Sequence, residues 1–218
     1  MDTGRCDIRA VFRLMDRKEH WEKTYAARRS DGLSWYQEKP DHSLAMIHRA
    51  GTGFDEPIID VGGGASVLVD HLLQEGYKDL TVLDISSIAL EKARERLGAR
   101  SGLVRWIEND ITAWAADRSY SLWHDRAVFH FLTKTEDRKK YINSLNQALK
   151  LNGHLIMATF SLDAPPKCSG LSVVRYGPET LQNELGDNFN LVESFTDKHV
   201  TPSGVSQIFI FCRFVKHA

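Results

Sequence analysis

Three adjacent glycines follow a short apolar run in residues 58–66, which read IIDVGGGAS. Glycine allows a tight turn and a close approach of the backbone to a ligand, because it has no Cβ. A helix that begins after such a turn also offers free N–H groups. We therefore predict that the backbone of Gly62, Gly63 and Gly64 holds a ligand, although a turn that only joins a strand to a helix has the same composition.

The residues beside the glycines restrict the class of ligand. A dinucleotide fingerprint requires a small residue at the position of Val67, and a phosphate-binding P-loop requires Gly-Lys-Ser/Thr, so this turn fits neither motif. Asp60 precedes the glycines, and its carboxylate would repel a pyrophosphate but attract a cationic group. The turn therefore favours a ligand with a cationic amino-acid tail.

Two further acids lie at the ends of the next two predicted strands. Asp84 ends the run LTVLD and is followed by Ile85. A carboxylate at this position can accept hydrogen bonds from both hydroxyls of a ribose. Asp110 follows the next run, where an acid can meet an adenine amino group while Ile111 packs against the ring. Each acid also has a structural alternative, because Asp84 can cap the following helix and Asp110 can cap a turn.

Together these positions resemble the motifs of the class I S-adenosylmethionine-dependent methyltransferases: Asp60, Gly62, Gly64, Asp84, Asp110 and Ile111. The resemblance extends from about residue 21 to the C-terminus, and it departs from the family at the third glycine, where this chain has Ser66. It implies that the chain is an enzyme with S-adenosylmethionine as cofactor and S-adenosylhomocysteine as product. The methionine part would lie on the glycine turn, the ribose at Asp84 and the adenine between Asp110 and Ile111.

The fourth predicted strand brings more reactive groups to the same edge, where residues 121–132 read SLWHDRAVFHFL. Asp125 can accept a hydrogen bond from an acceptor amine, or it can pair with Arg126. His130 can act as a general base, since an imidazole with a pKa of about 6.5 accepts a proton near neutrality, or it can lie half-buried beside Phe129. We predict Asp125 and His130 as catalytic residues, and Arg126 and Phe129 as acceptor-site residues.

An aromatic pair precedes the glycine turn. Trp35 and Tyr36 can fold over the cofactor as a lid that excludes water and holds a cationic amine, or they can pack a helix onto the sheet. Methyl transfer from a sulfonium is a direct in-line displacement, so positioning and desolvation provide most of the catalysis and no covalent intermediate is required. His124 alternates with Asp125 along its strand and is predicted to have a structural role.

The predicted strands and helices that carry the candidate site residues alternate along the chain. Five apolar runs of strand length, PIIDV, LTVLD, LVRWIEN, YSLWHD and GHLIMATF, are separated by helical patterns. Strand and helix in alternation predict a doubly wound, Rossmann-like α/β fold with a mostly parallel seven-stranded sheet and helices on both faces. The link between two late runs, 189–195 and 205–214, is too short for a crossover helix, so they form a C-terminal antiparallel hairpin. We expect one domain, residues 1–218, with an N-terminal helical lid segment (1–50) and a Rossmann-like core (51–218).

Composition excludes several classes of function. The chain has 218 residues and 42% hydrophobic residues, enough for one core. Lys and Arg number 28 against 29 Asp and Glu, so no basic surplus indicates nucleic acid or an anionic membrane. Cys6, Cys168 and Cys212 lack metal-ligand spacing, so we predict no metal.

No secretory or membrane-spanning segment is evident, and we expect a cytoplasmic protein. The oligomeric state stays open, as does whether Met1 or Met15 is the natural start.

The acceptor is less constrained than the cofactor. Residues 20–22 (HWE), 34–36 (SWY) and 125–127 (DRA) look most like a branch with protein-lysine methyltransferases, including those acting on elongation factors. In that branch the acid matched by Asp125 meets the target lysine, while Arg-Ala here replaces a Lys-Gly pair. A small-molecule methyltransferase acting on a thiol, phenol or amine is the alternative, and a closed pocket would favour it over a protein acceptor. A non-catalytic cofactor-binding or partner-binding module and an NAD-dependent dehydrogenase also stay open.

Overall fold

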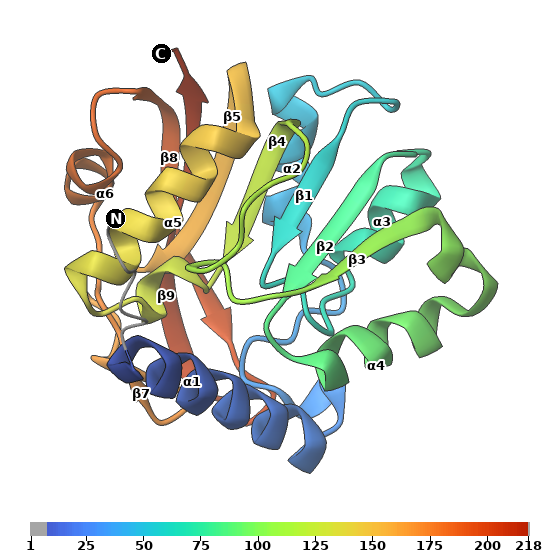
Figure 1. Ribbon diagram of the computed structural model, residues 1–218, viewed down its shortest axis with the longest axis vertical. Coiled ribbons are helices and arrows are strands. Elements are labelled where there is room, and N and C mark those ends of the chain that lie inside the picture. Colours follow the sequence, from blue (N-terminus) through green and yellow to red (C-terminus); the bar gives the residue numbers. More distant parts are fainter. Residues whose placement is uncertain (1–7, 218) are drawn as a thin grey trace, which may run out of the picture.

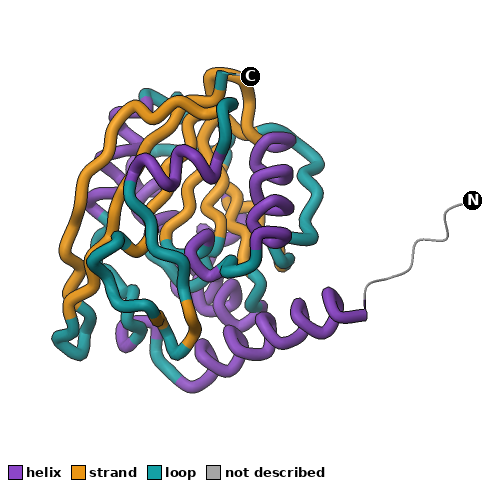
Figure 2. The backbone as a smooth tube through the Cα atoms, turned by 90° about the vertical axis from the view of Figure 1, so that its left-hand side faces the viewer, coloured by secondary structure: helices purple, strands orange, loops and turns teal. Residues whose placement is uncertain are grey.

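A computed structural model describes the backbone of residues 8–217 and the side chains of residues 16–217 (Figure 1, Figure 2). Its centre is a seven-stranded sheet with the order β3-β2-β1-β4-β5-β9-β8. The strands are β1 (Ile58–Val61), β2 (Leu80–Asp84), β3 (Val104–Glu108), β4 (Tyr120–Arg126), β5 (Leu149–Phe160), β8 (Phe189–Val200) and β9 (Ser206–Lys216). The strands β1 to β5 run parallel, whereas β9 is antiparallel to both β5 and β8. The predicted fold and the C-terminal hairpin are confirmed.

The order of the strands reverses beside β1. β1 pairs in parallel with β2 on one side and with β4 on the other, so the chain leaves β1 toward one half of the sheet and returns to build the other. In open α/β sheets the crevice at the carboxyl ends of such strands is the usual place for a ligand. The glycine turn directly follows β1 and therefore lies at this crevice.

Helices cover both faces of the sheet. One face packs against α2 (Asp41–Ala50), α3 (Leu68–Glu75) and α4 (Ser87–Leu97), and the other packs against α5 (Thr135–Ala148) and α6 (Pro178–Leu185). Side chains alternate along β4, so Leu122 belongs to the first core and Trp123 to the second. This alternation decides which β4 side chains meet the crevice. The described residues also form three short 3-10 turns, η1 (Ser30–Gly32), η2 (Gly98–Leu103) and η3 (Phe129–Phe131).

Three features of the fold differ from the sequence-based expectation. The helix α2 falls inside the predicted lid segment, yet Met46 and Ile47 are buried in the core beneath the sheet. The strand β5 begins at Leu149, directly after α5, because Leu149 already pairs with Tyr120. A small hairpin of β6 (Lys167–Cys168) and β7 (Leu171–Ser172) was not expected from the sequence. Each depends on tertiary packing more than on local pattern.

The helix α1 (Ile8–Ala27) lies across the carboxyl ends of the parallel strands, at the lower edge of the sheet in Figure 1 and beneath the rest of the fold in Figure 2. The predicted N-terminal helical segment therefore contains a long helix. Among the described helices, none combines the length and apolarity needed to cross a membrane.

Candidate active site

A cavity opens at the carboxyl ends of the strands, between the glycine turn and α1. Its wall brings together seven of the predicted site residues: Trp35, Gly62, Asp84, Ile85, Asp110, Ile111 and Arg126. A second, adjoining cavity is lined by Tyr36, Asp60 and Gly63, and it shares Trp35, Gly62 and Arg126 with the first. Residues from five separate parts of the sequence therefore converge on one site.

The glycine turn is required by geometry. Gly62 has φ +67°, and a Cβ added to it would lie 1.9 Å from Cγ2 of Val128. Gly64 has φ +43°, and its Cβ would lie 2.7 Å from both Oδ2 of Asp84 and the hydroxyl of Tyr25. Only glycine adopts these angles without strain and lets Val128, Asp84 and Tyr25 pack this closely against the turn. The turn thus forms a bare backbone cradle beside a buried carboxylate.

Asp84 is a buried carboxylate that faces the cavity. Its Oδ1 accepts a hydrogen bond from the Ser86 N–H at 2.8 Å, and it forms no ion pair with any side chain of residues 16–217. Burial raises its pKa to about 7, and the negative charge of Asp60 adds to the shift. The N-cap of α4 is Ser86, whose Oγ accepts from the Ala89 N–H at 3.1 Å, so capping does not explain Asp84. Its carboxylate remains available for hydroxyl donors in the cavity.

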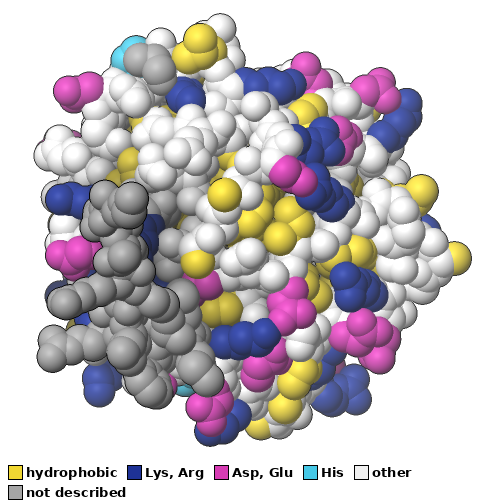
Figure 3. All heavy atoms as spheres, viewed as in Figure 1, with side chains coloured by type: hydrophobic (Ala, Val, Ile, Leu, Met, Phe, Trp, Pro, Cys, Tyr) yellow, Lys and Arg dark blue, Asp and Glu magenta, His cyan; other side chains and the backbone are white. Residues whose placement is uncertain are grey.

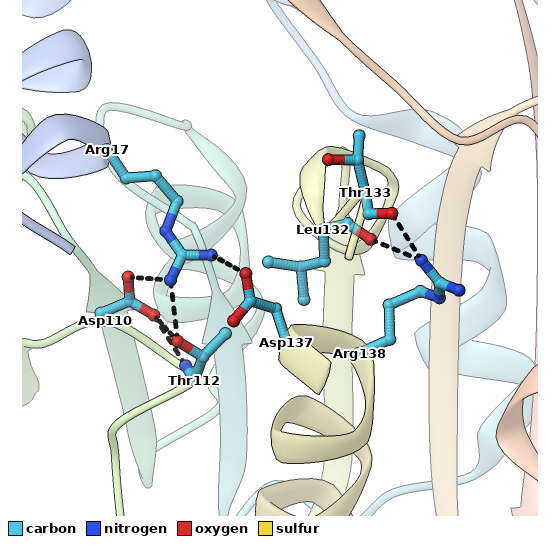
Figure 4. A network of polar contacts seen from close by, with 7 residues as sticks. All are labelled: Arg17, Asp110, Thr112, Leu132, Thr133, Asp137 and Arg138. Carbon is cyan, nitrogen blue, oxygen red and sulfur yellow. Dashed lines mark hydrogen bonds and ion pairs between the residues drawn. The ribbon is translucent and has the colours of Figure 1, made fainter. Parts of the chain in front are cut away.

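Asp110 combines a turn cap with a contact to α1 (Figure 4). Its Oδ1 accepts from the backbone N–H of Thr112 at 2.8 Å and from the Thr112 hydroxyl at 2.6 Å. Its Oδ2 pairs with Arg17 at 3.0 Å, and Arg17 also pairs with Asp137 at 3.3 Å. The turn-cap alternative is therefore realised, while Asp110 and Ile111 still line the cavity.

Asp60 belongs to a buried chain of hydrogen bonds that we did not anticipate. Its Oδ1 lies 2.7 Å from Nδ1 of His124, and Nε2 of His124 lies 2.9 Å from the Ser43 hydroxyl. All three side chains are buried. The register pairs Asp60 with His124 on neighbouring parallel strands, which is the signal that could have indicated the contact. The predicted structural role of His124 agrees with this arrangement.

The geometry does not support direct catalysis by Asp125. Its side chain is fully buried and does not line either cavity. Its oxygens accept from the N–H groups of Val128 (2.9 Å) and Phe129 (3.2 Å) and from the Tyr141 hydroxyl (2.6 Å). Strand alternation explains the difference, because it turns Asp125 toward α5. This carboxylate fixes the turn that follows β4.

His130 and Phe129 also lie outside both cavities. Nδ1 of His130 accepts from the Phe160 N–H at 3.2 Å, and burial together with the charge of Arg126 lowers the pKa of His130 to about 3. So weak a base holds few protons at neutral pH and is poorly matched to general-base catalysis. Phe129 packs between Tyr141 and Tyr176, with ring centroids 4.9 and 5.7 Å away. The 3-10 turn η3 directs both side chains into the core, whereas we predicted a catalytic general base at His130 and an acceptor-site residue at Phe129.

Aromatic side chains of α1 and the following loop roof the cavity. Trp21 and Tyr25 each contact Trp35 edge-on, with ring centroids 5.6 and 5.8 Å apart. Of the two residues predicted for a lid, Trp35 lines both cavities and Tyr36 lines the second, whereas Trp21 and Tyr25 were not identified as site residues. Glu22 anchors this roof, because its carboxylate accepts from the Ser86 hydroxyl and the Ser87 N–H, both at 2.8 Å, at the start of α4.

The end of β4 supplies a cation and a strained backbone. One guanidinium nitrogen of Arg126, Nη1, donates to the carbonyl of Trp35 at 2.8 Å, and the group lies 5.0 Å from the ring centroid of Phe209. Ala127 has φ +69°, a conformation that glycine adopts freely and alanine does not. Among the described residues no group of three His, Cys, Asp or Glu side chains is arranged to hold a metal ion.

Comparison with known proteins agrees with this geometry. A family model described as a methyltransferase domain matches residues 59–155. EEF1A lysine methyltransferase 2 of Homo sapiens is 21% identical over 192 residues, which cover 81% of this chain and 75% of that protein. A malonyl-[acyl-carrier protein] O-methyltransferase of Anoxybacillus flavithermus is 29% identical over 156 residues, 69% of this chain and 56% of that protein.

A solved structure shows the same fold at low identity. The 1,6-didemethyltoxoflavin-N1-methyltransferase of Burkholderia thailandensis, with bound 1,6-didemethyltoxoflavin and S-adenosylhomocysteine, superposes with a TM-score of 0.71 and 14% identity. The alignment covers 100% of this chain and 94% of that one. The names of these proteins give different methyl acceptors, so the similarity concerns the methyltransferase domain and its fold more than the acceptor.

Proposed function

Because the chain is a class I S-adenosylmethionine-dependent methyltransferase, we propose that it methylates a small molecule that enters the cavity beneath α1. The observation that carries this proposal is the roof of the cavity. Trp21, Tyr25 and Trp35 lie over the ends of the strands, and Phe209 and Cys168 also line the cavity. A covered, largely apolar pocket with few polar groups is typical of small-molecule sites.

The chain's residues fit the cofactor on two independent observations. The glycine cradle has no space for a side chain at Gly62, and Asp84 is a buried carboxylate without a cation partner among residues 16–217. We assign the methionine part to the glycine turn beside Asp60, the ribose to Asp84, and the adenine to Asp110, Ile111 and Ile85. S-adenosylmethionine supplies, when bound, an electrophilic methyl group on a sulfonium.

The residues of the chain contribute to transfer by positioning and desolvation. Trp21 and Trp35 exclude water, and Arg126 fixes the loop that carries Trp35. Asp125 holds the turn after β4 through the N–H groups of Val128 and Phe129, and so acts as a positioning residue. We assign no proton transfer to His130, because it is buried away from the cavity.

A protein lysine is the second candidate acceptor. It is favoured by the similarity to the human EEF1A lysine methyltransferase 2 over 81% of this chain. An ammonium group that entered beside Arg126 would, however, meet a fixed like charge, which disfavours a lysine approach by this route. A nucleic acid acceptor is disfavoured, since basic and acidic side chains are intermixed on the described part of the face in Figure 3.

The proposal is tested by asking which fraction of a cell extract accepts a labelled methyl group. Purified protein is incubated with methyl-tritiated S-adenosylmethionine and either the filtrate or the retained macromolecules of the extract. We expect label in the small-molecule filtrate, suppressed by excess S-adenosylhomocysteine. Label recovered in methylated lysine of the macromolecular fraction, with none in the filtrate, would establish the second candidate instead.

A further inference from the structure

Arg126 is a cation without an anionic partner inside the site. It is partly buried, its Nε is fully buried and makes no hydrogen bond, and it forms no ion pair with any side chain of residues 16–217. Its contacts are neutral: the carbonyl of Trp35 and the ring of Phe209. A charged group held away from water normally pairs with an opposite charge, because leaving it unpaired costs free energy.

The two nearby acids that act on Arg126, Asp197 and Asp60, each already pair with a histidine. Asp197 pairs with His42 at 3.1 Å, and Asp60 bonds to His124 at 2.7 Å. Both act on the guanidinium only through space, while burial lowers the pKa of Arg126 to about 10. The side chain is therefore charged at neutral pH and has unused hydrogen-bond donors, and Arg126 lines both cavities.

The position of Arg126 separates it from the groups that fit the nucleoside. Asp84 and Asp110 lie at the ends of β2 and β3, on one side of β4. Arg126 ends β4 and reaches Phe209 in β9, which lies beyond β5 on the other side. Cys168 and Phe209 line the cavity on this side. An anion bound here would share the cavity with the ribose and adenine positions but would lie toward β9, on the other side of β4 from β2 and β3.

We propose that Arg126 binds an anionic group of the methyl acceptor, a carboxylate or a phosphate, and so selects an acidic small molecule. This inference rests on the proposed function and deepens it. A guanidinium presents two parallel N–H donors to such a group and would fix the acceptor's orientation toward the methyl group. The cofactor also carries a carboxylate, and Arg126 lines the second cavity beside the glycine turn, so the test must separate these two sources.

The first experiment asks whether Arg126 serves the cofactor. Calorimetric titration compares S-adenosylhomocysteine with 5′-methylthioadenosine, which lacks the amino-acid group, on the wild type, Arg126→Gln and Arg118→Gln. Arg118 is a matched control, since it stacks on Tyr120 at 5.6 Å but lies outside both cavities. We expect S-adenosylhomocysteine affinity within about twofold in all three proteins. A loss of tenfold or more in Arg126→Gln, confined to S-adenosylhomocysteine, assigns the arginine to the cofactor and overturns the proposal.

The second experiment asks whether the acceptor is acidic. The small-molecule filtrate is separated on a strong anion exchanger at neutral pH, and both fractions are assayed for methyl transfer. We expect activity in the retained fraction, with KM raised about 10- to 100-fold in Arg126→Gln, less in Arg126→Lys, and unchanged in Arg118→Gln. Activity in the flow-through, or in no small-molecule fraction, overturns the inference. Transfer to macromolecules with unaltered cofactor binding would instead show failure of the proposed function.

Discussion

The two halves of the cavity are built in different ways. The half formed by the ends of β1 to β3 uses bare backbone at Gly62 and two single acids, Asp84 as the last residue of β2 and Asp110 two residues after β3. The half formed by β4, β9 and α1 uses side chains that are distant in sequence, such as Trp21, Arg126 and Phe209. The first half depends on local motif and the second on tertiary packing, so they should respond differently to substitution.

Two buried carboxylates show the same contrast at the level of single groups. Asp84 faces the cavity with one oxygen bonded to the Ser86 N–H, whereas Asp125 is held by two N–H groups and the Tyr141 hydroxyl. Burial raises the pKa of both, to about 7 for Asp84 and about 6 for Asp125. The satisfied carboxylate stabilises the fold, and the under-satisfied one is available to a ligand.

Substitution of Gly62 should have the largest effect. In Gly62→Val the side chain would collide with Val128 and force a positive φ on a β-branched residue, so we expect a loss of roughly 3–5 kcal/mol in the free energy of unfolding and no cofactor binding. Chemical denaturation and calorimetry measure both quantities. Gly102→Val is the control, because a Cβ there meets no atom within 4 Å. Normal cofactor affinity in a folded Gly62→Val protein would show that the turn does not contact the cofactor.

Removal of Asp125 should damage the fold more than cofactor contacts. Asp125→Ala leaves two buried N–H groups and the Tyr141 hydroxyl without their acceptor, which we expect to cost about 2–4 kcal/mol of stability. Tyr141→Phe removes one of these bonds, together with the bond that Nε1 of Trp123 donates to the Tyr141 hydroxyl at 2.9 Å, and should cost less than the loss of all three bonds to Asp125. If instead Asp125→Ala keeps wild-type stability while turnover falls, the carboxylate acts directly on the acceptor, as the sequence suggested.

Substitution of Asp84, unlike that of Asp125, should affect cofactor binding more than the stability of the fold. Asp84→Asn removes a charged acceptor for the ribose, so we expect cofactor affinity to fall by about 1.5–3 kcal/mol. In the wild type, affinity should also fall as the pH is lowered from 8 through about 7, because the carboxyl group becomes protonated. Calorimetry at several pH values tests both expectations, and affinity that is independent of pH in this range would contradict them.

Although Asp84→Asn should weaken cofactor binding, it should stabilise the unliganded protein at pH 8. The pKa of Asp84 is raised in the folded state, so its ionised carboxylate destabilises the folded protein relative to the unfolded chain. This destabilisation is complete above pH 7 and disappears as the pH falls toward 3.8, the ordinary pKa of the carboxyl group in the unfolded chain. Asp84→Asn should therefore unfold at a higher temperature than the wild type at pH 8, with a gap that closes at acid pH. Equal melting temperatures at pH 8 would argue that this carboxylate is not under-satisfied.

The anchor of α1 should give the smallest effect. Glu22→Gln weakens the charge-assisted bonds to the Ser86 hydroxyl and the Ser87 N–H, so we expect a loss of about 1 kcal/mol or less and faster hydrogen exchange along residues 16–27. Glu19→Gln is a surface control on the same helix, since Glu19 is exposed and, among the side chains of residues 16–217, forms an ion pair with Lys23 alone. Unchanged exchange would mean that the roof is held by its aromatic contacts alone.

The same contrast explains what the sequence could predict. The sheet, its hairpin and the positions of Gly62, Asp84 and Asp110 follow from patterns that are local in the chain. The positions of Asp125 and His130 depend on which way β4 and η3 present their side chains. The sequence predicted that both face the cavity, whereas the structure buries Asp125 against Tyr141 of α5 and His130 against Phe160 and Phe209. The contact of Asp60 with His124 and Ser43, and the roof formed by Trp21 and Tyr25, require segments that meet only after folding.

The most direct measurement is calorimetric titration of the purified protein with S-adenosylhomocysteine, with NAD as control ligand and Asp84→Asn as control variant. We predict micromolar binding of S-adenosylhomocysteine to the wild type, at least tenfold weaker binding to Asp84→Asn, and none of NAD. A folded wild-type protein that binds NAD instead, or that binds neither ligand, would contradict the assignment of the glycine turn and Asp84 to this cofactor.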